Sequence, residues 1–293
     1  MVPVLSVEIT NVCNSRCVFC PNAIMKRRKE HLDMPLFKQG VDQYFEMGGT
    51  RVNFNCLVGE PFLDPHLMER IAYVRSHSQV ESLTFFSTLQ WLHKWDVDAI
   101  VSSGITALFV SVVLSGRDKY REFFGVDHYE QVLSNIDLLV EAIRKNNNDM
   151  TLELSLKPTG ERAEQIVSHP DFIRIEGLTG GKATKALEEM GMGVHDYSGK
   201  VRLPHSLRRR PLYPRYKRPC RLLYDHLKIF SNGNAGLCVC SDFEADSGLI
   251  IGNCRQSTVE ALWNGDNAES IRRAWKETNQ VPAICKSCRA YVY

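Results

Sequence analysis

Long apolar runs are missing from the 293-residue sequence. None approaches the roughly 20 consecutive apolar residues that a membrane-spanning helix needs. The N-terminus also lacks the charged start and the apolar stretch of a signal peptide. Net charge is small, with 36 lysines and arginines against 34 acidic residues, so a general attraction to nucleic acid or membranes is not expected. We therefore expect a soluble, cytoplasmic, globular protein.

Because no secretory signal is present, the ten cysteines are not expected to form disulfides. They should instead be free thiols or metal ligands. The length and the 44% content of hydrophobic residues suit one large domain, or one domain with a small addition.

Short β-branched runs alternate with longer helical patterns up to about residue 192. The predicted strands are Val4–Ile9, Arg51–Leu57, Ser82–Phe86, Ala107–Val113, Thr151–Leu156 and Phe172–Ile175. The predicted helices between them include Pro65–His77, Val97–Ser103, Tyr129–Lys145 and Glu161–Ser168. Continuous apolar strands favour a parallel sheet covered by helices. Six βα units in sequence predict an α/β fold, either an open sheet or an incomplete (β/α)6 TIM-like barrel.

The composition changes after Gly193. Lys200 to Tyr224 holds nine basic side chains and no acidic one, which indicates a linker or a wrapping loop. Beyond it, strands are predicted at His226–Ser231 and Ala235–Val239, separated by a strong hairpin signal at Ser231-Asn-Gly-Asn234. Helices are predicted at 258–263 and 267–278. We assign residues 1–199 to the barrel, 200–219 to a basic linker and 220–293 to a small metal-stapled α+β domain.

A first cysteine group, Cys13-x3-Cys17-x2-Cys20, directly follows the first predicted strand. Three thiolates on one loop favour a soft metal centre, either zinc or an iron–sulfur cluster. A zinc site normally has a fourth Cys or His ligand nearby, and none lies close in the sequence; the nearest is His31, which follows a charged run. Three ligands with an open fourth position indicate a cluster that binds something else, with structural zinc as the alternative.

This motif, with the aromatic Phe19 before its last cysteine, resembles the radical S-adenosylmethionine (SAM) superfamily. The resemblance implies that Cys13, Cys17 and Cys20 hold a [4Fe–4S] cluster whose open iron binds SAM. A second motif agrees, because Gly59-Glu60-Pro61 follows the second strand where the family has a SAM-contacting G-G-E-P; Val58 replaces its first glycine. The family's other SAM-contacting positions match Ser87, Thr88 and Ser111 more loosely. We predict these residues, with Phe19, to bind the cofactor.

A second cysteine group comprises Cys220, Cys238, Cys285 and Cys288. The spacing C-x17-C followed by a terminal C-x2-C resembles the twitch domain, a short form of the SPASM extension of radical SAM enzymes. The resemblance implies one auxiliary [4Fe–4S] cluster on these four residues, and it extends to superfamily members that act on aminocyclitols and aminoglycosides in antibiotic biosynthesis. A Cys₄ zinc site made by the same residues is the alternative.

Three cysteines remain, of which Cys254 is predicted to pack in the core. Core packing is also the first interpretation of Cys56, with the alternative that the alternation of its strand aims it into the barrel. Cys240 lies two residues beyond Cys238, where the resemblance implies a residue facing the substrate. A thiol there could return a hydrogen atom to the opposite face of a substrate radical. We therefore predict hydrogen abstraction from a carbinol C–H of a sugar or aminocyclitol, followed by epimerisation with Cys240 as the donor.

The alternative reaction is oxidation of the alcohol to a ketone, with the auxiliary cluster accepting an electron. That reaction needs a base, for which Asp242, Arg174 and Glu176 are unranked candidates.

The basic stretch Arg208–Arg221 is interpreted as a solvated face, since no RNA-binding motif accompanies it. The alternatives are binding of RNA, of a phosphorylated substrate or of an acidic surface. The chain enters its first strand without a leader-binding domain, so a small-molecule substrate is expected. The resemblance also implies an external electron donor such as flavodoxin or ferredoxin. The competing hypothesis from outside the enzyme class is a zinc-stapled RNA-binding or interaction protein.

Overall fold

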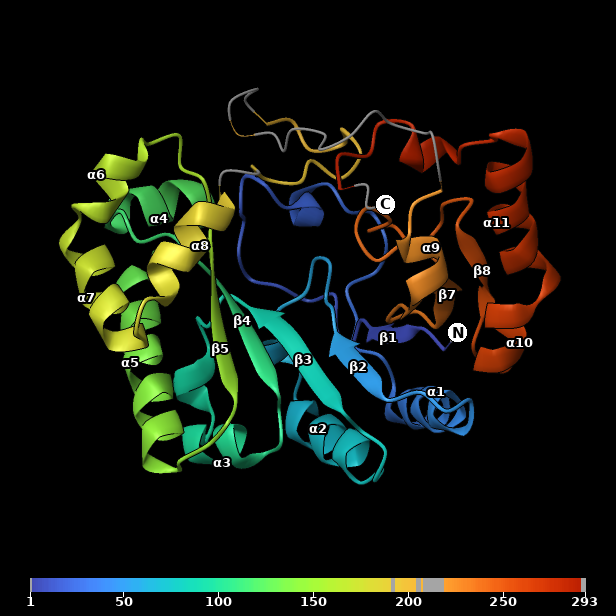
Figure 1. Cartoon of the computed structure of the whole chain (residues 1–293), viewed down its shortest axis with the longest axis horizontal. Coiled ribbons are helices and arrows are strands. Elements are labelled where there is room, and N and C mark those ends of the chain that lie inside the picture. Colours follow the sequence, from blue (N-terminus) through green and yellow to red (C-terminus); the bar gives the residue numbers. More distant parts are fainter. Residues whose placement is uncertain (1, 191–192, 204–206, 208–218, 291–293) are drawn as a thin grey trace.

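The computed structural model describes residues 2–190, 193–203, 207 and 219–290 (Figure 1). Within these residues, one sheet has the strand order β5-β4-β3-β2-β1-β6-β7-β8. Its strands are β1 (Val4–Val7), β2 (Arg51–Phe54), β3 (Ser82–Ser87), β4 (Ala107–Val112), β5 (Thr151–Leu156), β6 (His226–Ile229), β7 (Asn234–Gly236) and β8 (Ile250–Asn253). All pairings from β5 to β6 are parallel, whereas β6–β7 and β7–β8 are antiparallel.

Helices fill the crossovers between the parallel strands, as right-handed βαβ connections require. They are α1 (Met34–Glu46), α2 (Leu67–Arg75), α3 (Val97–Ser102), α4 (Arg117–Phe124), α5 (Tyr129–Lys145), α6 (Ala163–Val167), α7 (Pro170–Thr179) and α8 (Lys182–Met190). The C-terminal region adds α9 (Leu222–Asp225), α10 (Val259–Asn264) and α11 (Asp266–Thr278). Side-chain caps begin several of them: Asp33 accepts from Leu36 N, and Asp96 accepts from Ala99 N.

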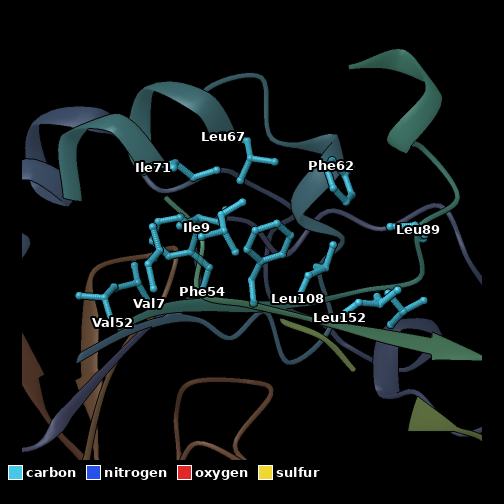
Figure 2. Packing of buried hydrophobic residues seen from close by; sticks show 14 of the residues in the cluster. Val7, Ile9, Val52, Phe54, Phe62, Leu67, Ile71, Leu89, Leu108 and Leu152 are labelled. Atoms are coloured by element: carbon cyan, nitrogen blue, oxygen red, sulfur yellow. The ribbon is translucent and has the colours of Figure 1, made fainter. Parts of the chain in front are cut away.

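The core lies between the sheet and the helices that cover it. Alternate residues of β3 and β4, such as Leu83, Phe85 and Leu108, are fully buried. Figure 2 shows Phe54 of β2 and Leu108 of β4 packing with Phe62 and with residues of α2. This layer fixes the relative positions of the strands, whose carboxyl ends therefore meet along one edge.

The α/β class with a mostly parallel sheet is confirmed, but the predicted strand Phe172–Ile175 is wrong. These residues belong to helix α7, with Pro170 at its first turn and Gly180 in a left-handed C-terminal cap. Phe172 and Ile175 are three residues apart and share the buried face, while Ile173 is 59% exposed. The sixth parallel strand is instead β6, which pairs with β1.

The predicted hairpin is confirmed, since β6 and β7 pair antiparallel and are joined by residues 230–233. Gly233 has a φ of +86°, a left-handed backbone that glycine adopts without a steric cost. The hairpin continues the sheet beyond β1, so the N-terminal and the C-terminal regions both contribute strands to one sheet (Figure 1). The boundaries 1–199, 200–219 and 220–293 stay a prediction. Among the described helices, none is long and apolar enough to cross a membrane.

Candidate active site

A cavity of about 440 Å³ opens at the carboxyl ends of the parallel strands. Residues following β1 to β5 line it, together with α8 and the segment 193–197. Its lining includes the predicted site residues Cys13, Cys17, Phe19, Cys20, Gly59, Glu60, Ser87, Thr88 and Ser111. Eleven residues were predicted to hold the first cluster, to bind SAM or to return the hydrogen atom. The tertiary structure brings nine of them together in this lining, which does not include Pro61 or Cys240.

The first cysteine loop is held by the end of α4. The backbone N–H of Arg16 donates to Phe124 O at 3.0 Å, and that of Val18 donates to Phe123 O at 2.9 Å. The ring of Phe19 packs edge-on against Phe124, with centroids 5.7 Å apart. Burial raises the pKa of the Cys20 thiol to about 12, so binding of iron must displace its proton. A loop fixed by backbone bonds is suited to presenting three sulfurs to one side.

Glu60 is 1% exposed and accepts three hydrogen bonds from the end of β3. Ser87 Oγ donates at 2.6 Å, Thr88 N at 2.8 Å and Thr88 Oγ1 at 2.7 Å. Burial raises the pKa of Glu60. Ser87 and Thr88 therefore orient the carboxylate besides lining the cavity. Their contact with SAM stays a prediction, as does that of Ser111.

The predicted auxiliary ligands lie near one another. The pKa of the Cys285 thiol is raised, mainly by burial. The neighbouring thiols of Cys238, Cys288 and Cys220 raise it further. Ser241 contacts two of them: its N–H donates to Cys238 Sγ at 3.3 Å, and its Oγ lies 3.7 Å from Cys288 Sγ. Among the described residues, no three His, Cys, Asp or Glu side chains are close enough to hold a single metal ion. Soft sulfur donors bind zinc as well as iron–sulfur clusters, so the donor type alone does not separate the two predictions.

The three remaining cysteines have different surroundings. Cys240 is half-buried and lies near Cys238, Cys288 and Cys220. Cys56, predicted as core, lines the cavity, and burial raises its pKa to about 12. Cys254 is 1% exposed, as predicted for a core residue.

None of the predicted bases lies in the described cavity lining. Asp242 accepts from Ser247 Oγ at 2.6 Å. Arg174 pairs with Asp137 at 2.5 Å, and Glu176 accepts from Thr184 Oγ1 at 2.5 Å. The side chains of Arg174 and Glu176 lie on α7, away from the cavity.

Sequence reasoning missed several residues of the cavity wall, including Lys157 at the end of β5, Glu189 of α8, His195 and Tyr197. No local motif marks them. Of the basic stretch, Arg208–Arg210, Arg215, Lys217 and Arg218 lie outside the described residues, whereas Arg221 pairs with Asp225 at 2.6 Å.

The fold and the two sulfur groups define an α/β iron–sulfur protein with its cavity at the strand ends. Residues 7–167 match the family model of the radical SAM superfamily, and residues 220–289 match the SPASM iron–sulfur cluster-binding domain. The chain therefore belongs to the radical SAM superfamily. The SAM cofactor, its [4Fe–4S] cluster and auxiliary iron–sulfur binding follow from these two domains.

Among proteins of described function, the chain is similar to GTP 3',8-cyclases of several bacteria. It is 23% identical over 174 residues to that of Chlorobaculum tepidum, covering 59% of this chain and 50% of that protein. It is 28% identical over 142 residues to that of Edwardsiella ictaluri, covering 47% and 42%. The chain thus spans about half the length of these relatives.

Solved structures share the fold over nearly the whole chain. BtrN in complex with AdoMet and 2-DOIA has a TM-score of 0.67 and 16% identity, covering 98% of this chain and 93% of BtrN. Streptococcus suis SuiB bound to the precursor peptide SuiA has a TM-score of 0.63 and 14% identity, covering 99% and 71%. At these identities the likeness concerns the fold.

Proposed function

We propose that this protein oxidises a carbinol of a sugar or aminocyclitol-type small molecule to a ketone. Cys13, Cys17 and Cys20 would hold the SAM-binding cluster, and Cys220, Cys238, Cys285 and Cys288 the auxiliary cluster. When bound, the first cluster with SAM supplies the radical that removes a hydrogen atom, and the auxiliary cluster supplies a one-electron acceptor. A flavodoxin or ferredoxin would supply the electron that starts the reaction.

One observation carries the choice of oxidation over epimerisation: the cavity wall is joined to the auxiliary cysteines by hydrogen bonds. His195 of the wall lies 2.9 Å from Ser241 Oγ, and Ser241 contacts Cys238 and Cys288. A second contact joins the same regions, because Asn55 Nδ2 donates to Val239 O at 3.2 Å. Close approach of substrate site and acceptor suits electron removal. Cys240, the donor required for the epimerisation we first predicted, lies outside the described lining.

Epimerisation remains the second candidate because Cys56 lines the cavity. With its pKa raised to about 12, this thiol keeps its hydrogen at neutral pH. A protonated thiol is what hydrogen-atom return requires, so Cys56 and Cys240 are both to be tested as donors.

The experiment is anaerobic turnover of the reconstituted protein in D₂O with a panel of sugars and aminocyclitols. Oxidation yields one ketone for each 5'-deoxyadenosine formed, and the ketone is lighter than the substrate by two hydrogens. The amount of ketone should be unchanged in Cys240→Ala and in Cys56→Ala. An inverted alcohol that carries one solvent deuterium, and that disappears in either cysteine variant, would instead establish epimerisation and name its donor.

A further inference from the structure

The loop that carries the three SAM-cluster cysteines continues into a strongly basic segment. Residues 16–29 contain five basic side chains and no acidic one. Arg27 is neutralised by the buried Glu8. The other four basic side chains are exposed, and none of them forms an ion pair with another described residue: Arg16, Lys26, Arg28 and Lys29.

Many exposed basic side chains elsewhere in the described part of the chain are paired. Lys145 lies 2.6 Å from Asp98, and Arg117 lies 2.7 Å from Asp127. Such pairs cancel most of each other's field. Unpaired charges of one sign on a short segment instead produce a positive potential at the surface.

Acidic side chains border this surface without cancelling its charge. Glu244 and Asp246 line an open groove together with Lys26 and the exposed Lys200, which leaves that groove balanced. The excess positive charge therefore comes from three basic side chains, against the single acidic Glu30 that follows the segment: Arg16, Arg28 and Lys29.

Two apolar side chains are exposed in the same segment. Val18 is 46% and Ile24 48% exposed, and they are two of the six large hydrophobic side chains that are exposed among the described residues. An apolar contact surrounded by polar and charged side chains is the usual anatomy of a protein–protein interface.

This surface belongs to the loop that holds the first three cysteines. Arg16 and Val18 flank Cys17, whose side chain lines the cavity. Lys29 is close enough to the thiols of Cys13 and Cys20 to interact with them electrostatically. The segment therefore presents cysteines to the cavity and basic side chains to the solvent, so an electron that arrives at this surface has a short path to the cluster.

We propose that residues 16–29 are the docking surface of a small acidic electron-carrier protein. This inference rests on the external donor named in the proposed function, and it holds whether the product is a ketone or an inverted alcohol. The donor loses one electron and the SAM-binding cluster gains it, with no bond formed between the two proteins. Short-lived complexes of this kind bury less than about 1,200 Å² and depend on complementary charge for fast association.

The first test compares two reductants of the reconstituted protein. The probes are reduced flavodoxin and dithionite, and the readout is 5'-deoxyadenosine formed from SAM without substrate, together with flavodoxin oxidation in stopped flow. In the double variant Lys26→Glu/Arg28→Glu, we expect the flavodoxin rate constant to fall at least tenfold at low salt. The dithionite rate, the iron content and SAM binding should equal those of the wild type.

The matched control is Arg273→Glu/Lys276→Glu, which makes the same charge change at two exposed side chains of α11. Figure 1 shows α11 at the right-hand edge of the molecule, apart from the dark-blue segment that follows β1. This variant should keep the wild-type flavodoxin rate. Raising the salt from about 20 to about 300 mM should slow wild type and control, and should have little effect on Lys26→Glu/Arg28→Glu.

The second test locates the contact directly. Carbodiimide joins the carboxylates of flavodoxin to lysines that touch them, and mass spectrometry of the product should find the cross-links at Lys26 and Lys29. Cross-links confined to Lys286, beside the terminal cysteines, would place the donor at the auxiliary cluster and overturn the proposal.

A flavodoxin rate unchanged in Lys26→Glu/Arg28→Glu, or one independent of salt in the wild type, would also overturn it. If that variant loses iron, Lys26→Gln/Arg28→Gln takes its place, and its ratio of flavodoxin rate to dithionite rate should fall at least threefold. A wild-type product that is an inverted alcohol would overturn the proposed oxidation and leave the docking surface as assigned.

Discussion

The guanidinium of Arg27 donates two hydrogen bonds of 2.6 Å to the carboxylate of Glu8. Glu8 follows β1 and is fully buried, and Arg27 belongs to the segment after the first cysteine loop. Arg27 Nε also donates to Phe243 O at 2.6 Å, and the N–H groups of Lys26 and Arg27 donate to Glu244. The pair therefore joins the first strand, the SAM-cluster loop and the segment that follows Cys238.

Arg27→Met should lower the free energy of unfolding by about 3–5 kcal/mol, because the buried carboxylate of Glu8 loses its partner. The control is Arg117→Met, whose pair with Asp127 at 2.7 Å is exposed; its loss should cost about 0–1 kcal/mol. Urea-induced unfolding under anaerobic conditions measures both. Equal stabilities of the two variants would show that the buried pair contributes no more than a surface pair.

Gly59→Ala should disrupt the SAM site, because a Cβ at this position would lie 2.1 Å from Thr10 O, a backbone atom. The strand ends must shift, at a cost of about 1–3 kcal/mol, and SAM affinity should fall at least tenfold. Gly177→Ala is the control, since Gly177 lies in α7 with nothing within 4 Å. That substitution should stabilise the helix by up to about 1 kcal/mol. Calorimetric SAM binding equal to wild type in Gly59→Ala would contradict the predicted contact.

Iron analysis after reconstitution tests the two ligand sets separately. Two four-iron clusters give about eight irons per chain, and Cys17→Ala and Cys238→Ala should each reduce this to about four. Cys254→Ala should retain the wild-type content, because Cys254 belongs to the buried core. Zinc is measured in parallel. One zinc with about four irons in the wild-type protein would assign the second group to zinc.

A pH effect on stability is expected from Tyr73, whose hydroxyl donates to Asp42 Oδ1 at 2.7 Å and joins α2 to α1. Burial and the neighbouring carboxylate raise the pKa of Tyr73 to about 12. The folded protein keeps this proton where the unfolded chain, with a pKa of about 10, releases it. The contribution of the Tyr73 hydroxyl to the free energy of unfolding is therefore fully present below pH 10 and is lost as the pH rises towards 12.

Urea midpoints of the cluster-free protein between pH 9 and 12 test this, with Tyr73→Phe as the comparison. The difference in stability between wild type and variant should shrink as the pH rises. A difference that stays constant over that range would show that the bond to Asp42 does not hold the phenol proton.

The sequence alone determined the class of the fold and the position of the first cluster loop. Cys13–Cys20, Gly59–Pro61 and Ser87–Thr88 each follow a predicted strand, and the carboxyl ends of parallel strands lie on one edge of the sheet. The strand predicted at Phe172–Ile175 failed because four residues are too few to separate a period of 2 from one of 3.6. The signals that mark helix α7 are instead Pro170 at its start and Gly180 at its end.

Only the tertiary structure decided which side chains form the cavity wall. His195 and Ser241 are 46 residues apart and meet because residues 195–199 pack on the terminal C-x2-C motif. The placement of Cys56 in the cavity lining, and of Cys240 outside it and near the auxiliary cysteines, likewise comes from the tertiary structure. Local patterns encode the periodicity of a strand and the spacing of ligands. Contacts between distant segments depend instead on packing across the whole sheet, which no short stretch of sequence specifies.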